Sequence, residues 1–276
     1  MRRPGGAVSL GGMGDDAREA VLVEERGPLL MIGLNRPEKR NAADRAMLTG
    51  LAAALTRLES DEALRVGLIW AVGEHFTAGL DLTDPDGPLA TGADAFLGGD
   101  LVDPWQLRGP ARTKPLVVAV QGTCLTLGVE LVLAADIAVA ADTAVFGQIE
   151  VSRGILPFGG ATIRFPRVSG WGNAMRWLLT GERFDAREAY RIGLVQEVVP
   201  AGTERSAAQR IAERIAEQAP LAVAATLANA RLATAEGPDA AAAALPRELA
   251  RLAASKDAAE GMRSFAERRD PVFRGD

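Results

Sequence analysis

The stretch LVVAVQGTCLTLGVELVLAADIAVA, residues 116–140, reads as a strand, a helix and a second strand in succession. The runs at 116–120 and 137–140 are continuously apolar, which is typical of strands that are buried on both faces of a parallel sheet. The apolar segment 128–135 between them predicts the connecting helix. This alternation indicates an α/β fold with parallel strands.

The residues that precede this unit continue the same architecture. Two β-type runs, at 20–25 and 29–34, flank the turn Arg26-Gly27-Pro28 and predict a hairpin. Leucines and a methionine recur at helical spacing between 41 and 59, which predicts an amphipathic helix. The run RVGLIWAV at 65–72 predicts another buried strand.

The C-terminal part of the chain differs in composition. From Thr203 onward Ala, Arg, Glu and Leu predominate, so we expect helices alone in this region. Breaks between these helices are expected at Pro220, Gly237-Pro238 and Pro246. The resulting domain plan has a flexible glycine-rich leader at 1–19, an α/β core at 20–200 and a helical region at 201–276.

Composition and charge exclude several classes of protein. The chain has 276 residues and a net charge of −5, so a basic surface for nucleic acid is not expected. Its single cysteine and single histidine exclude a disulfide framework and Cys- or His-rich metal sites. The longest uncharged apolar stretch, 115–129, is shorter than the roughly 20 residues of a spanning helix, and no secretory signal is visible. We therefore expect a cytoplasmic protein without membrane or nucleic-acid partners.

Two glutamates stand in apolar surroundings. Burying an unpaired carboxylate costs several kcal/mol, so Glu130 must be paired, protonated or exposed to a cavity. Glu150 raises the same question. The structural alternatives are an ion pair of Glu130 with Arg164 or Arg167, and a surface pair of Glu150 with Arg153. The functional alternative is that the two glutamates form a general acid/base pair.

Two glycine-containing turns follow predicted strands, at 76–82 and at 121–122. A strand that runs into a small-residue turn and then a helix presents unpaired backbone N–H groups, which suit an anion or a developing oxyanion. The alternative is ordinary use of glycine in tight turns.

Six segments together closely resemble motifs of the crotonase superfamily of enoyl-CoA hydratases and isomerases, and they span residues 21–273. In chain order they are NRPEKRNA (35–42), HFTAGLDL (75–82), VQGTCLTLGVELVLAADIAVA (120–140), FGQIEVSRGILPFGGA (146–161), TGERFDAREAYRIGLVQEVVP (180–200) and EGMRSFAERRDPVF (260–273). The resemblance implies a crotonase-type spiral core of ββα turns with a C-terminal helical trimerisation region. It also implies a homotrimer, or a hexamer built as a dimer of trimers.

The resemblance assigns roles to individual residues. Glu130 and Glu150 match the two catalytic glutamates of hydratases, and the backbone N–H groups of Leu80 and Leu127 match the oxyanion hole. The expected contacts with the acyl-CoA substrate are Lys39, Arg40, Ala42, Ala78, Gly79, Asp81, Leu82, Gly128, Phe158, Phe265 and Arg268.

The activity implied is hydration of a 2-trans-enoyl-CoA to a 3-hydroxyacyl-CoA. It would require no metal and no redox cofactor, since coenzyme A is part of the substrate. One alternative is a Δ3,Δ2-enoyl-CoA isomerase, in which a single glutamate moves the proton. Another is an acyl-CoA-binding protein that has lost catalysis.

The sequence departs from the family's motifs at two positions. Thr126-Leu127-Gly128 replaces a glycine triplet, so the second oxyanion donor carries a leucine, which would be costly at a positive φ. Phe158 replaces a glycine, and we expect it to narrow the acyl pocket.

Overall fold

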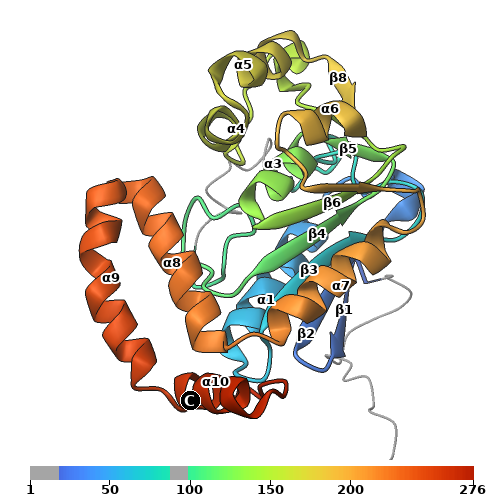
Figure 1. The fold of residues 1–276 in the computed structure, drawn as a ribbon. Coiled ribbons are helices and arrows are strands. Elements are labelled where there is room, and N and C mark those ends of the chain that lie inside the picture. The colour runs from blue at the N-terminus through green and yellow to red at the C-terminus, as the bar shows by residue number, and fades with distance from the viewer. Residues whose placement is uncertain (1–18, 88–98) are drawn as a thin grey trace, which may run out of the picture.

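The computed structural model describes residues 19–87 and 99–276, and it has the α/β architecture expected from the sequence (Figure 1). The larger of its two sheets has the strand order β1-β2-β3-β4-β6-β9. The bounds of these strands are Val21–Arg26, Leu29–Leu34, Val66–Ala71, Leu116–Val120, Ile137–Ala141 and Glu197–Val199. Strands β1 and β2 form the predicted antiparallel hairpin, and all other neighbouring pairs are parallel. The leader expected at 1–19 lies, apart from Glu19, outside the described residues.

A second sheet is built from three strands of three residues each. These strands are β5 (Thr123–Leu125), β7 (Val145–Gly147) and β8 (Arg183–Asp185). Strand β5 is parallel to β7, and β7 is antiparallel to β8. The chain passes from β4 to β5 and again from β6 to β7, so each of these two turns adds a strand to both sheets. This arrangement brings the segments that follow β5 and β7 next to each other.

Helices cover both faces of the larger sheet, because its strands are apolar on both faces. Helix α1 (Arg45–Ser60) packs against Leu30 and Ile32 on one face of β2. Helix α7 (Glu204–Ala216) packs against Leu29 and Met31 on the other face. Helix α7 is therefore part of the core packing, although it follows the domain boundary that we expected at residue 200.

The remaining helices of the core lie near the smaller sheet (Figure 1). Helix α3 is buried along its whole length and connects β5 to β6. The bounds are α3 Leu127–Ala134, α4 Ala161–Ser169, α5 Trp171–Thr180 and α6 Ala186–Arg191, with short 3₁₀ helices η1 at Pro37–Lys39 and η3 at Glu150–Arg153.

The C-terminal helices form an arm that stands away from the sheets (Figure 1). They are α8 (Pro220–Glu236), α9 (Pro238–Ala253) and α10 (Lys256–Glu267). The expected breaks before α8 and α9 are confirmed, since each of these helices has a proline in its first turn. The break expected at Pro246 is wrong, because this residue lies inside α9. Strong helix formers on both sides of it and packing of α9 against α8 outweigh the one backbone hydrogen bond that a proline removes.

An ion-pair cluster fixes α8 to the core. Arg112 is 1% exposed, and its guanidinium lies 2.6 Å from the Asp136 carboxylate, which follows α3. Arg231 of α8 lies 2.9 Å from the other oxygen of the same carboxylate. The single aspartate therefore joins the arm to a buried cation of the core.

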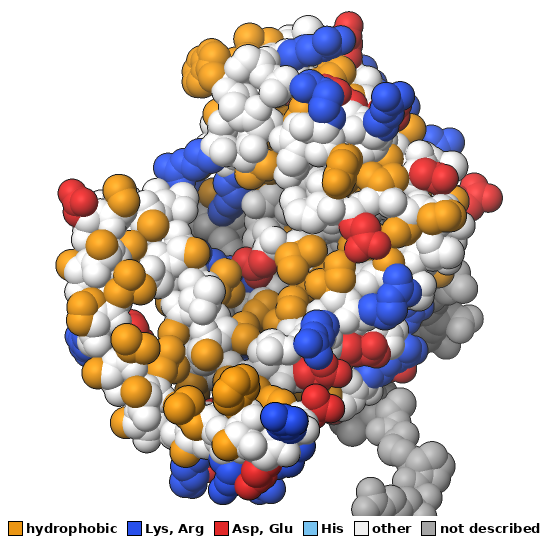
Figure 2. Space-filling model, in the orientation of Figure 1, with side chains coloured by type: hydrophobic (Ala, Val, Ile, Leu, Met, Phe, Trp, Pro, Cys, Tyr) orange, Lys and Arg blue, Asp and Glu red, His pale blue; other side chains and the backbone are white. Residues whose placement is uncertain are grey.

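The surface of the arm is rich in apolar side chains, which appear in orange along α8 and α9 in Figure 2. Large hydrophobic residues that are exposed in the C-terminal region are Leu245, Leu249, Met262, Phe265 and Val272. Within 19–87 and 99–276, no helix combines the length and the hydropathy that a membrane span requires.

Candidate active site

Glu130 lies on the first turn of α3 and is fully buried. Its Oε1 accepts a 3.0 Å hydrogen bond from the backbone N–H of Ala161, and its Oε2 has no hydrogen-bond partner among the described residues. The ion pairs considered with Arg164 and Arg167 do not form. The Arg164 guanidinium instead donates to the carbonyl groups of Gly159 and Gln106.

The surroundings of Glu130 place its titration near neutral pH. Burial raises the pKa of the Glu130 carboxyl to about 7, although the backbone amides of Ala161 and Gly159 and the charge of Arg164 oppose this shift. A Cβ at Gly159 would lie 2.5 Å from Glu130 Oε2. The loop before α4 can therefore approach this carboxyl only because residue 159 lacks a side chain.

Glu150 begins η3 and is 5% exposed. Burial raises the pKa of its carboxyl to about 7, and the negative charge of Glu130 adds to the shift. The surface ion pair considered with Arg153 does not form among the described residues. With its amide nitrogen turned toward these acceptors, the buried Gln148 donates to Glu150 Oε1 and to the carbonyl of Thr126, both at 3.1 Å.

A positive φ, which would be costly at Leu127, occurs in the turn before α3 at the preceding residue, Thr126. Leu127 has a negative φ, whereas Thr126 has a φ of 50° and a ψ of −116°. A β-branched residue rarely adopts such a φ, so the surrounding contacts must hold it. The Thr126 N–H donates to Gly147 at 2.8 Å, and its carbonyl accepts from the Glu130 N–H at 3.1 Å. Gly79 leaves room for the Thr126 hydroxyl, because a Cβ there would lie 1.8 Å from it.

Two backbone N–H groups near this turn have no acceptor within the described parts of the chain. Leu127 is the first residue of α3, so its N–H has no partner within the helix. Leu80 lies between Gly79 and Asp81, which both bond to the backbone of Ala43. Because the backbone groups alternate in direction along such a segment, the N–H of Leu80 points away from Ala43.

A cavity of about 160 Å³ joins these groups. Its lining residues come from the segments after β3, β5 and β7, and they are Ala78, Leu80, Leu82, Thr126, Leu127, Ile149, Glu150, Arg153, Ile155 and Phe158. The two unpaired N–H groups therefore belong to residues on the same cavity as Glu150. Glu130 is not among the residues that line this cavity, but its negative charge contributes to the raised pKa of Glu150. Phe158 also contributes to the wall of this cavity.

Nearly the whole chain is similar to proteins of known family. The family model for enoyl-CoA hydratase/isomerase matches residues 24–276. The chain belongs to this family. It is 35% identical to enoyl-CoA hydratase EchA19 of Mycobacterium tuberculosis, over 91% of this chain and 95% of that protein. It is 33% identical to the 2,3-dehydroadipyl-CoA hydratase of Escherichia coli, over 92% and 98% of the two chains.

Solved structures of the hydratase/isomerase family confirm the fold. A probable enoyl-CoA hydratase/isomerase from Mycobacterium abscessus superposes with a TM-score of 0.90 and 52% identity, over 94% of this chain and 99% of the other. An enoyl-CoA hydratase from Mycobacterium tuberculosis H37Rv gives a TM-score of 0.83 and 37% identity, over 94% and 100%. The protein is therefore an enzyme of the hydratase/isomerase class with the crotonase-type fold.

Two of the motifs of the hydratase/isomerase family lie side by side. The N–H of Ala78 donates to the carbonyl of Arg40 at 2.9 Å, which brings segment 35–42 against segment 75–82. The exposed side chains of Lys39 and Arg40 lie at the end of η1, and Ala42 follows them. Lys39 and Arg40 therefore belong to a segment whose backbone pairs with Ala78, a residue of the cavity wall.

Two residues that we expected at the substrate make structural contacts. The Asp81 carboxylate accepts hydrogen bonds from Thr83 and Arg36, and the Thr83 hydroxyl is the main cause that lowers its pKa. A Cβ at Gly128 would lie 2.4 Å from the side chain of Thr77. Gly128 therefore allows close packing at the start of α3.

The structure does not bring Phe265 and Arg268 together with the cavity. Phe265 lies on α10 with 86% of its surface exposed, and Arg268 follows the end of this helix. In Figure 1, α10 lies at the foot of the arm, well away from η3 and α3. Their role in binding coenzyme A stays a prediction.

Sequence reasoning missed the residues that hold the reacting groups in place. Trp105 donates from Nε1 to the carbonyl of Leu127 at 3.0 Å and is 3% exposed. Gln148 and Ala161 bind the two carboxyls, and Gly159 gives one of them space. Gln148 could have been found as a polar residue two positions before a candidate glutamate, but its contact partner is not visible in the sequence.

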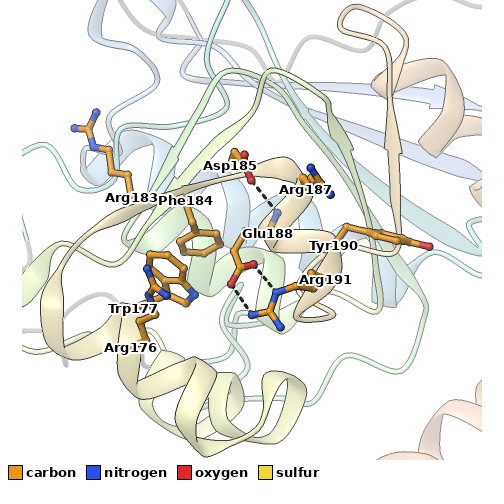
Figure 3. A pocket seen from close by; sticks show the side chains of 9 residues that line it. All are labelled: Arg176, Trp177, Arg183, Phe184, Asp185, Arg187, Glu188, Tyr190 and Arg191. Carbon is orange, nitrogen blue, oxygen red and sulfur yellow. Dashed lines mark hydrogen bonds and ion pairs between the residues drawn. The ribbon is translucent and has the colours of Figure 1, made fainter.

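A larger cavity of about 900 Å³ lies among α5, β8 and α6 (Figure 3). The Glu188 carboxylate faces the Arg191 guanidinium at 2.6 Å, and Asp185 accepts from the Glu188 N–H at the start of α6. The hydrogen bond from Arg191 holds the pKa of Glu188 below its usual range. The ion pair with Arg191 thus favours the ionised form of Glu188.

Proposed function

We propose that this enzyme adds water to 2-trans-enoyl-CoA thioesters and forms 3-hydroxyacyl-CoA. The observation that carries the proposal is the pair Glu130 and Glu150, two buried carboxyls whose pKa values are each raised to about 7. Hydration needs one group that accepts a proton and one that donates a proton at the same pH. Two coupled carboxyls that titrate near neutrality can supply both forms.

The oxyanion hole is the first element of the proposed mechanism. The N–H groups of Leu80 and Leu127 would donate to the thioester carbonyl oxygen, which becomes negatively charged as the enolate forms. Each such donor is worth about 3–4 kcal/mol in oxyanion holes that have been tested by mutation. Trp105 binds the carbonyl on the far side of Leu127, so it would hold the peptide in place.

The two glutamates then transfer protons in opposite directions. Ionised Glu130 takes a proton from water while the water oxygen bonds to C3, and protonated Glu150 delivers its proton to C2. The Ala161 N–H and the Arg164 charge favour the ionised form of Glu130. The charge of ionised Glu130 in turn favours the protonated form of Glu150. After the addition, the protonation states are reversed and a proton must return to Glu150.

Measuring how the enzyme converts crotonyl-CoA and its longer homologues tests this proposal. A hydratase removes the enoyl-thioester absorbance and, in ¹⁸O-labelled water, yields a product that carries one heavy oxygen atom. An isomerase would convert a 3-enoyl-CoA to a product of unchanged mass, and a binding protein would do neither. Failure to take up labelled oxygen with every enoyl-CoA offered would disprove the hydratase proposal.

We also propose the setting in which the enzyme works. The exposed apolar residues of the C-terminal arm suit contact with a second copy, in a homotrimer or a hexamer. The mechanism uses only backbone amides and carboxyl groups, so we propose that no cofactor takes part besides the coenzyme A of the substrate. A cytoplasmic location, with neither a membrane nor a nucleic acid as partner, completes the proposal.

A further inference from the structure

Arg153 is the one positively charged residue among the described residues that line the 160 Å³ cavity. It ends η3, and Glu150 begins the same helix. A 3₁₀ helix has about three residues per turn, so residues i and i+3 project from the same face. The guanidinium therefore comes from the same wall as the proposed proton donor, one helical turn further along.

The guanidinium of Arg153 is not used by the protein itself. Within the part of the chain that the structure describes, no carboxylate lies within 4 Å of it and it makes no hydrogen bond, although Glu150 is its neighbour on the helix. Arg153 is exposed, and apart from Glu150 the other lining residues of its segment are apolar, namely Ile149, Ile155 and Phe158. A cation in such a wall can bind an anionic group of a ligand. A neutral apolar group of the ligand would gain nothing from it.

An anionic group that Arg153 binds could belong to coenzyme A, as a phosphate, or to the acyl chain. The position of Arg153 favours the acyl chain. The phosphates of coenzyme A have candidate partners in Lys39 and Arg40, which belong to a different segment, one whose backbone pairs with Ala78. Arg153 lies instead on the wall of Glu150, together with Ile155 and Phe158. An anion that reaches it from this wall would belong to the acyl chain.

We propose that Arg153 recognises a carboxylate at the far end of the acyl chain, so that the preferred substrates are enoyl-CoA thioesters of dicarboxylic acids. The planar guanidinium fork can bind both oxygens of such a carboxylate. This inference rests on the proposed hydratase function and names the substrate class of the same cavity.

A matched pair of substrates tests it. We would compare kcat/KM for 2-hexenoyl-CoA with that for 2-hexenedioyl-CoA, which has the same length and a terminal carboxylate. Arg153→Met keeps an unbranched side chain of about the length of the arginine's aliphatic stem and removes the charged guanidinium. We expect this variant to lower the ratio of diacid to monoacid kcat/KM at least tenfold while kcat/KM for 2-hexenoyl-CoA stays within twofold. Arg153→Glu should lower the ratio further.

Arg187→Met is the control, because Arg187 is exposed, lines the other cavity and undergoes the same loss of charge. It should leave the ratio unchanged. A ratio that is the same in Arg153→Met and in the unmodified enzyme overturns the inference. An equal loss for both substrates, which disappears with N-acetylcysteamine thioesters that lack phosphates, also overturns it and assigns Arg153 to coenzyme A.

The two proposals fail in different ways. If the unmodified enzyme hydrates 2-hexenoyl-CoA but shows no preference that depends on Arg153, only the substrate class is wrong. If it hydrates neither thioester nor any shorter or longer homologue, the hydratase function itself is wrong.

Discussion

The carboxyl of Glu130 on α3 is held at 3.0 Å by the backbone N–H of Ala161, the first residue of α4. The two residues are 31 positions apart, and each lies at the start of a helix. The N-terminal end of a helix carries a partial positive charge, so α4 stabilises the ionised form of this buried acid. One oxygen is thereby oriented, and the other is left without a protein partner among the described residues.

Replacing either glutamate by glutamine should abolish most of the activity and leave the fold intact. Glu130→Gln retains an oxygen that can accept from Ala161, but it cannot take a proton from water. We expect kcat for crotonyl-CoA to fall at least about 10²-fold in Glu130→Gln and in Glu150→Gln. Circular dichroism should show unchanged secondary structure. Hydration at nearly the original rate in either folded variant would exclude the two-carboxyl mechanism.

Gly159→Ala should impair catalysis through Glu130. The added Cβ would lie 2.5 Å from Glu130 Oε2 and 2.9 Å from the Trp105 ring, so the carboxyl must move. We expect a loss in kcat of at least tenfold, since small displacements of a reacting group are costly. Gly172→Ala on α5 is the matched control, because a Cβ there meets nothing within 4 Å. Equal activities of the two variants would show that the Gly159 contact does not matter.

The raised pKa of Glu130 makes stability depend on pH in a defined direction. The carboxyl titrates near 4.5 when exposed and near 7 in the folded chain, so folding favours the protonated form. The protonated carboxyl therefore contributes its full share to the free energy of unfolding below pH 4.5, and this contribution is lost as the pH rises through 7. Since one pKa unit corresponds to about 1.4 kcal/mol, the loss is at most about 3 kcal/mol.

Glu130→Gln lacks this titration, so its stability relative to the unmodified protein should increase from pH 5 to pH 8. Urea unfolding of both proteins at one fixed protein concentration measures the difference. If the difference between the two proteins is the same at both pH values, the pKa of Glu130 is not raised.

Neighbouring arginines at the C-terminus should have different roles. Arg269 donates to the Glu260 carboxylate at 3.0 Å, and its hydrogen bonds hold the pKa of Glu260 well below the usual range. Arg268 makes no such contact within the described residues. Arg268→Ala should therefore raise KM for CoA thioesters without changing kcat, because this contact is remote from the reacting carbons. Arg269→Ala should mainly lower the thermal stability of the C-terminal region.

The contrary result for Arg268 is equally clear. If KM is unchanged in Arg268→Ala, coenzyme A is anchored elsewhere, and Lys39 and Arg40 become the first residues to replace.

The strands of the larger sheet could be predicted because burial on both faces imposes continuous apolar runs, as in β3 and β4. The smaller sheet could not be predicted, since three residues are too few to show a periodicity. Pro246 misled the prediction because a local signal for a helix break was outweighed by the packing of α9 on α8.

The candidate site was predictable to the extent that its groups belong to motifs. The six segments located Glu130 and Glu150, whereas the apolar setting alone favoured a structural role for each, such as an ion pair with an arginine. The contacts to Ala161 and Gln148 depend on how the two sheets bring loops together, and no local pattern reports such distances. The positive φ at Thr126 could not be predicted, because motif comparison shows where glycines are replaced and not which residue carries the strained backbone.

The ion pairs of Asp136 couple the unfolding of the C-terminal arm to that of the core. If α8 left the core, Arg231 would leave with it, and the Asp136 Oδ1 and the carbonyl of the buried Arg112 would each lose a hydrogen bond from Arg231. Detachment of the arm would thus weaken the interior it leaves behind, so the two should lose structure as one cooperative unit. Amide protons in the middle of α8 should then exchange with solvent at rates close to those of β4, even though the helix projects into the solvent.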